Sequence, residues 1–92
     1  VQFHLNPPLL VRQARSVALS DSECGALLAL SERMGKPVST ETMEQRVSQH
    51  SGTVSPGYIK TIMLRIRRKV DSIGGDSAVL GAVRGFGYVL RS

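Results

Sequence analysis

The feature that most constrains the fold is a helical stripe of apolar side chains in the second half of the chain. The stripe recurs at spacings of four, three and four residues, at Ile59, Met63, Ile66 and Val70. Such spacing puts these side chains on one face of an α-helix. The sequence therefore predicts a helix over residues 57–72, and it requires the rest of the chain to cover this face.

The opposite face of this predicted helix is basic. At about 100° per residue, Thr61, Arg65 and Arg68 point nearly away from the stripe. A guanidinium on such a face can pair with a guanine edge or with a phosphate, and Thr61 can offer its methyl group to a thymine or its hydroxyl to a phosphate. The candidate contact residues on and beside this face are Tyr58, Thr61, Ile62, Leu64, Arg65, Arg67 and Arg68. Lys69 lies nearer the core and is expected to keep only its ammonium in water.

The net charge of +5 is concentrated in the same half of the chain. Residues 1–54 carry five cations and five anions, whereas residues 55–92 carry seven cations and two anions. This asymmetry favours a polyanionic partner for the C-terminal half. Charge alone leaves open the alternative of a solvated face that only keeps the domain in solution.

Length, cysteine content and hydropathy limit the class of protein. The 92 residues are expected to form one domain, and because the chain begins at Val1 we expect it to be part of a longer protein. Cys24 is the only cysteine, so neither an internal disulfide nor a cysteine-based zinc site is expected. The sequence has no apolar run long enough to span a membrane and no signal peptide, which predicts a cytoplasmic protein without membrane contact.

Residues 1–19 are predicted to form a small antiparallel sheet. Val1–Leu5 alternates apolar and polar side chains and stops at Asn6-Pro7-Pro8, which is typical of a half-buried strand. Leu9–Val11 and Ser16–Leu19 then flank a polar turn.

Two helices are predicted between this sheet and the basic helix, so that the three-helix core covers residues 21–72. Ser20 and Glu23 have the spacing of a capping box, which starts a helix over residues 21–33. Its apolar stripe consists of Cys24, Leu27, Leu28, Leu30 and Met34, and Gly35 is expected to end it. Ser39 is expected to cap a second helix over residues 40–49, in which Met43 and Val47 face inward. Residues 50–57 are predicted to be a loop.

A β-hairpin is predicted over residues 79–90. Arg84 lies at its turn, where Gly85 and Gly87 allow backbone angles that other residues resist. Phe86 and Tyr88 are expected to be packing residues. An N-terminal sheet, three helices and a hairpin wing together predict an α+β domain of the winged helix-turn-helix type.

Four segments in order carry a resemblance to a known family. They are Leu19-Ser20-Asp21-Ser22-Glu23, Gly35-Lys36-Pro37-Val38-Ser39, Arg65-Ile66-Arg67-Arg68-Lys69-Val70 and Val83-Arg84-Gly85-Phe86-Gly87-Tyr88-Val89-Leu90. Over essentially its whole length, the chain resembles the C-terminal DNA-binding domain of bacterial response regulators of the OmpR/PhoB family.

The resemblance implies a function and roles for single residues. It implies sequence-specific binding of double-stranded DNA and transcription regulation, as the output domain of a two-component response regulator. It also implies that Arg65 reads a base, that Arg67 meets a phosphate and that Arg84 enters the adjacent minor groove. Two protomers would bind a tandem repeat, and the loop over residues 50–57 would face RNA polymerase.

The chain departs from the family pattern at several contact positions. Ile62 and Leu64 stand where polar or histidine side chains are usual, Ala82 replaces a wing threonine, and Ser51-Gly52 and Gly57 replace loop positions that often hold tryptophan and arginine. Ile62 and Leu64 are expected to touch either thymine methyl groups or another protein. The alternatives are therefore a winged helix that binds protein instead of DNA, and a domain that binds structured RNA.

Catalysis has little support in the sequence. His4 and His50 are not placed with a serine or cysteine in a nucleophilic arrangement, and the carboxylates are scattered. We expect no enzyme activity, no metal and no cofactor.

Overall fold

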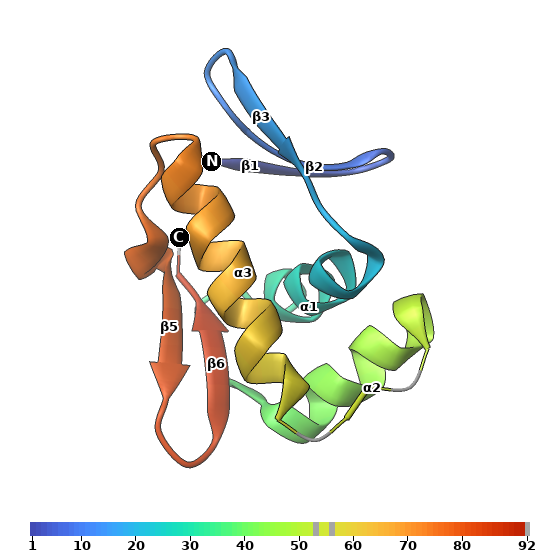
Figure 1. Ribbon diagram of the computed structural model, residues 1–92. Coiled ribbons are helices and arrows are strands. Elements are labelled where there is room, and N and C mark those ends of the chain that lie inside the picture. Colours follow the sequence, from blue (N-terminus) through green and yellow to red (C-terminus); the bar gives the residue numbers. More distant parts are fainter. Residues whose placement is uncertain (53, 56, 92) are drawn as a thin grey trace.

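The computed structural model describes residues 1–52, 54–55 and 57–91, and the predicted sheet, helices and hairpin follow one another in the predicted order (Figure 1). The strands are β1 (Gln2–Leu5), β2 (Pro8–Arg12), β3 (Arg15–Ala18), β4 (Val38–Ser39), β5 (Leu80–Val83) and β6 (Gly87–Leu90). The helices are α1 (Asp21–Ser31), α2 (Thr40–Ser51), α3 (Tyr58–Ser72) and the short 3₁₀ helix η1 (Ser77–Val79). In Figure 1, α3 lies between the β5–β6 hairpin and the pair formed by α1 and α2.

The N-terminal strands form an antiparallel sheet in the order β1-β2-β3, as predicted. Phe3 pairs with Leu10, and Leu10 pairs with Val17, so these three side chains share one face of the sheet. Leu10 is buried in the core, and Phe3 and Val17 pack against it. The sheet therefore covers one end of the helical core.

The predicted capping box at the start of α1 is present. The Ser20 side chain accepts a hydrogen bond from the Glu23 amide (3.2 Å), and the Glu23 carboxylate accepts one from the Ser20 amide (2.8 Å). The helix ends at Ser31, two residues earlier than predicted. The placement of Met34 in the buried stripe is wrong, because this residue follows the helix and is 50% exposed.

Helix α2 begins as predicted and ends later. Ser39 caps it by accepting from the Thr42 amide (3.2 Å), and the helix continues to Ser51 instead of residue 49. The predicted loop over residues 50–57 is shorter for this reason, and its positions 53 and 56 lie outside the described residues. Gly25 allows α1 and α2 to approach closely, since a Cβ there would lie 3.1 Å from the Val47 Cα.

The hairpin belongs to a second sheet, in the order β4-β6-β5. Strand β4 was not predicted from the sequence; it has only two residues and precedes α2 directly. Val38 pairs with Tyr88 and Ser39 with Gly87. A Cβ at Gly87 would overlap the Val38 carbonyl oxygen and lie 2.9 Å from the Ser39 Cα. Glycine is therefore required for the hairpin to pair with the segment that starts α2.

Replacing Gly87 with alanine should weaken this attachment. We expect Gly87→Ala to lower the free energy of unfolding by about 3 kcal/mol, because backbone atoms must move to admit the methyl group. Gly85→Ala is the matched control in the same hairpin. Gly85 has φ of +75° and open space around it, so that variant should lose only about 1 kcal/mol through backbone strain. Urea unfolding measures both, and equal losses would contradict the pairing.

Candidate nucleic-acid interface

The buried face of α3 is the predicted one. Ile59, Met63, Ile66 and Val70 are each at most 3% exposed and belong to the core cluster. Their burial turns the opposite side of the helix to solvent. We define the outer face of α3 as the exposed side chains Thr61, Leu64, Arg65 and Arg68.

The prediction that Ile62 is an exposed contact residue is wrong. Its side chain is 0% exposed and belongs to the core. Ile62 lies three residues after Ile59 and four before Ile66, so helical geometry places it at the edge of the buried stripe. A side chain without exposed surface has nothing to offer a thymine or a partner protein. Leu64, by contrast, is 47% exposed, as expected.

Arg65 is held in place by Tyr58, one of the flanking residues. Arg65 Nη1 donates a hydrogen bond to the Tyr58 hydroxyl (2.9 Å). The Arg65 Cζ lies 5.6 Å from the centre of the Tyr58 ring, which is within the range of a cation–π contact. Tyr58 is half-buried and packs against the core. The guanidinium therefore extends from a fixed aromatic support, which limits its freedom in the free protein.

Arg67 does not belong to the outer face. It is half-buried, and its Nη2 donates a hydrogen bond to the Leu80 carbonyl in β5 (2.8 Å). Its Nε is buried and has no hydrogen-bond partner among the described residues. The residue thus connects α3 to the base of the hairpin, and the role of phosphate contact suggested by the resemblance stays a prediction.

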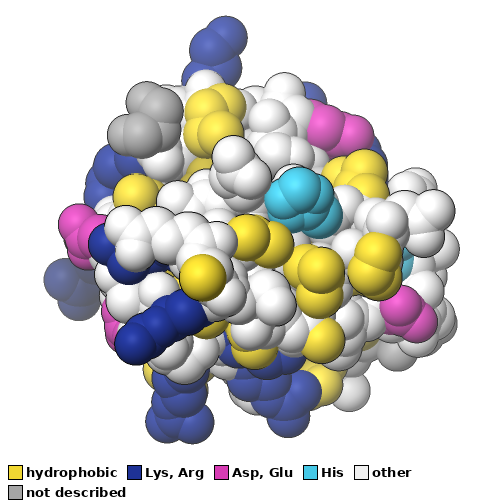
Figure 2. All heavy atoms as spheres, turned by 90° about the horizontal axis from the view of Figure 1, so that it is seen from above, with side chains coloured by type: hydrophobic (Ala, Val, Ile, Leu, Met, Phe, Trp, Pro, Cys, Tyr) yellow, Lys and Arg dark blue, Asp and Glu magenta, His cyan; other side chains and the backbone are white. Residues whose placement is uncertain are grey.

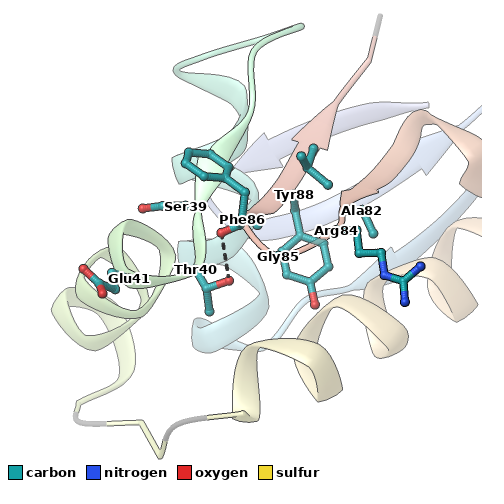
Figure 3. Close-up of a pocket in the computed structure, with 10 residues that line it drawn as sticks. Ser39, Thr40, Glu41, Ala82, Arg84, Gly85, Phe86 and Tyr88 are labelled. Carbon is teal, nitrogen blue, oxygen red and sulfur yellow. Dashed lines mark hydrogen bonds between the residues drawn. The ribbon is translucent and has the colours of Figure 1, made fainter.

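Arg84 is exposed at the tip of the hairpin, as predicted. The Phe86 amide donates to the Val83 carbonyl (3.0 Å), and Gly85 adopts φ of +75°, which closes the turn. The prediction that Phe86 packs inward is wrong, since it is 51% exposed. In the close-up of Figure 3, Phe86 and Arg84 point away from each other on the two sides of the wing. Tyr88 is half-buried against the core, as predicted.

A shallow hollow of about 590 Å³ separates the start of α2 from the hairpin. Its lining includes Thr40 and Glu41 from α2, and Ala82, Arg84 and Tyr88 from the hairpin (Figure 3). The residues that line the hollow come from the β4–α2 segment and the hairpin, and Arg84 is the one arginine among them. The hollow therefore borders the wing on the side of α2.

Several exposed cations of α3 and the wing are free to meet an external anion. Among the described residues, Lys60, Arg68 and Arg84 take part in no hydrogen bond or ion pair. Elsewhere the arrangement differs: Arg46 of α2 forms a two-pronged ion pair with Glu32, its Nη2 lying 2.8 Å from Oε2.

The end of the molecule seen in Figure 2, over the N-terminal sheet, mixes apolar, uncharged and histidine side chains, with Lys and Arg gathered mostly along the lower and left margins.

A partly buried ion pair, which was not predicted from the sequence, fixes the side of α3 that faces α1. Glu23 is 2% exposed, and its carboxylate accepts a hydrogen bond from Lys69 Nζ. Lys69 also donates to the Ala18 carbonyl (2.9 Å). Burial raises the pKa of Glu23, but the hydrogen bonds from Lys69 and the Ser20 backbone, together with the charge of Lys69, outweigh it and lower this pKa below its ordinary 4.5. The capping-box spacing predicted the position of Glu23 but not its second partner, which lies 46 residues away.

Two further findings concern the described part of the chain only. Residues 1–52, 54–55 and 57–91 contain no group of three or more His, Cys, Asp or Glu side chains that could hold a metal ion. No helix formed by these residues combines the length and the apolar character that crossing a membrane requires.

The fold and this surface together define a class: a winged helix-turn-helix domain with a cationic outer face on its third helix. The family model described as "Transcriptional regulatory protein, C terminal" matches residues 14–90, and the chain belongs to this family. It is a DNA-binding output domain of a transcription regulator of the response-regulator type. The predicted fold, family and general function are therefore confirmed.

Similar proteins agree with this assignment. The transcriptional regulatory protein TctD of Salmonella typhimurium, in strains SL1344 and LT2, is 32% identical over 79 residues, which are 86% of this chain and 34% of that protein. This chain thus spans about a third of the length of these relatives. The C-terminal domain of the nisin resistance regulator NsrR, a lantibiotic response regulator, matches with a TM-score of 0.77 and 30% identity, over 91% of this chain and 84% of that chain.

The Glu23–Lys69 pair leads to a stability prediction. Lys69→Met keeps most of the side-chain volume but leaves the buried carboxylate without its cation, which should lower the free energy of unfolding by about 1–3 kcal/mol at pH 7. Lys60→Met is the control, because Lys60 is exposed and should change stability by less than about 0.5 kcal/mol. Chemical unfolding of the three proteins provides the measurement.

The same pair fixes the sign of a pH dependence. The pKa of Glu23 is lowered in the folded state, so the stability it contributes is complete above the unfolded pKa and is lost as pH falls through the folded value. The difference in stability between the wild type and Lys69→Met should therefore shrink as pH falls below about 4.5. A difference that stays constant down to acid pH would contradict the ion pair.

Proposed function

We propose that the domain binds duplex DNA by placing the outer face of α3 in the major groove and Arg84 in the adjacent minor groove. The observation that supports this most is the position of the cations. Arg65 and Arg68 project from the outer face of α3, and Arg84 projects from the tip of the wing. An α-helix fits the major groove, and arginine is attracted to the negative potential of a narrow minor groove.

Within this arrangement, each residue of the outer face has a proposed role. Arg65, supported by Tyr58, is the candidate for pairing with a guanine. Arg68 is the candidate for a phosphate or a second base, and Thr61 for a thymine methyl group or a phosphate. Leu64 has exposed apolar surface that suits a thymine methyl group.

In this proposal, Arg67 acts mainly through its contact with the protein backbone. Its hydrogen bond to Leu80 holds the hairpin against α3, so its main contribution is to the distance between helix and wing. Its Nε is buried, so only its Nη groups remain as candidates for a phosphate contact, which is the role that the resemblance implies.

The function of the longer protein is part of the proposal. As the output domain of a bacterial two-component response regulator, the domain would bind a tandem repeat together with a second protomer and act in the cytoplasm. The region over residues 50–57 would face RNA polymerase. The similarity to the lantibiotic response regulator domain and to TctD supports the output-domain role in this proposal.

We propose no catalytic role for the chain. Burial raises the pKa of the Cys24 thiol, and the nearby charge of Asp21 raises it further. A buried thiol of this kind is a poor nucleophile. Binding is the activity that the described side chains support.

Removing single arginines tests the DNA-binding geometry. Arg65→Ala and Arg84→Ala should each weaken binding to a selected duplex by about 1–3 kcal/mol, because each removes a direct contact to a base or a groove. Arg33→Ala removes an exposed cation from the segment after α1 and should leave specific binding nearly unchanged. Fluorescence anisotropy at fixed salt measures all three. Unchanged affinity in both interface variants would sink the proposal.

The alternative is a winged helix that binds another protein through apolar surface on α3. This alternative rested on two apolar residues. Ile62 is buried and cannot contact a partner, whereas Leu64 remains exposed. Salt discriminates between the two. DNA readout predicts that affinity falls steeply with salt while preference for one sequence persists. Absence of duplex binding at low salt supports the protein-binding alternative, and preference for RNA over the same DNA sequence supports the third possibility.

A further inference from the structure

The first amide of α2 is bonded to the wing instead of to its own helix or to a cap. The first amides of a helix have no partner within that helix. At α2, the Ser39 side chain satisfies the Thr42 amide (3.2 Å). The Thr40 amide donates to the Phe86 carbonyl (3.0 Å), and the Thr40 hydroxyl lies 3.4 Å from the same oxygen (Figure 3). The turn of the hairpin is therefore tied to the start of α2.

This hydrogen bond acts close to the residue that the proposed function places in the minor groove. Phe86 is two positions from Arg84, and its own amide closes the turn by donating to the Val83 carbonyl (3.0 Å). The Phe86 amide is thus bonded within the hairpin, and the Phe86 carbonyl is bonded to α2. The Arg84 side chain itself has no partner among the described residues. Its direction depends on the backbone of the turn.

The rest of the hairpin is held further from its tip. Ser39 pairs with Gly87, and Arg67 bonds to the Leu80 carbonyl at the base of the wing. A two-stranded ribbon is only marginally stable by itself. Movement about these lower attachments would displace the tip the most. The Thr40 amide is the contact placed where it limits that movement.

We propose that the backbone amide of Thr40 is a positioning group for DNA recognition: it holds the wing tip so that Arg84 meets the minor groove. This inference rests on the proposed function, in which Arg84 contacts DNA. It assigns to Thr40 a role that acts through Arg84 and not through contact of Thr40 with a base. The hydroxyl of Thr40 contributes little, because its distance to the carbonyl is at the long limit for a hydrogen bond.

The position allows a test that removes the amide hydrogen of Thr40. Proline lacks the amide proton, and it is well tolerated at the first position of a helix. Ser39 has φ of −66° and ψ of 152°, which is the conformation favoured before a proline. Thr40→Pro should therefore delete the bond to Phe86 and, because the ring carbon takes the place of the amide hydrogen against that carbonyl oxygen, move the wing tip away without breaking α2. Thr40→Ala is the matched control, because it removes the hydroxyl and keeps the amide.

Duplex affinity is measured for these variants alone and combined with Arg84→Ala. We expect Thr40→Pro to weaken binding by at least about fivefold, because it removes the hydrogen bond and displaces the wing tip, and Thr40→Ala to change it less than about twofold. We also expect the loss to be non-additive, so that Thr40→Pro has little further effect in the Arg84→Ala background. A purely structural effect would instead add to that of Arg84→Ala, and it would overturn the inference.

The outcomes separate the inference from the proposed function. If Arg84→Ala binds DNA like the wild type, the proposed contact of Arg84 fails. If Arg84→Ala weakens binding and Thr40→Pro does not, only the role of Thr40 fails. Hydrogen exchange in the wild type tests the bond independently of whether Thr40→Pro folds. The Thr40 amide should exchange slowly and become slower still in the DNA complex, whereas rapid exchange in the free protein would overturn the inference.

Discussion

Burial of one face of α3 is the constraint on which the rest of the structure depends. Ile59, Met63 and Ile66 are at most 1% exposed, and no rotation of the helix could keep them covered while moving Arg65 or Arg68 inward. The hydrophobic effect thus fixes the direction of the cationic face. Lys69, on the side of the helix facing α1, holds the same orientation through its ion pair with the buried carboxylate of Glu23. The outer face can be basic because it takes no part in the core.

The wing depends on the same helix but is held by backbone contacts. Its carbonyl groups accept hydrogen bonds from Arg67 at the base and from the Thr40 amide at the tip, and Gly87 allows it to pair with the residues that precede α2. None of these contacts uses Arg84. The wing can therefore carry a recognition residue at its exposed turn, because other residues set its position. The side chain at the tip is not needed to hold the wing in place.

Local patterns predicted much of this arrangement, because helix periodicity and caps act over a few residues. The stripe of α3, the capping box at Ser20 and the cap at Ser39 are all present. The errors arose where distant segments meet. Ile62 is buried because other elements cover the edge of the stripe, and β4 exists only because β6 lies beside it. The partner of Glu23 is 46 residues away, a separation that no local pattern reports. Phe86, judged by its apolar type, is exposed because the turn points it outward.

The central claim is that the outer face of α3 and the tip of the wing together form one DNA-binding surface. NMR chemical shifts of the backbone amides and the arginine side chains, followed during titration with a duplex selected from random sequences, test this most directly. The account predicts that Thr61, Arg65, Arg68 and Arg84 shift together with one apparent affinity, while the strands of the N-terminal sheet change little. Shifts confined to the N-terminal sheet, or to α3 without the wing, would contradict it.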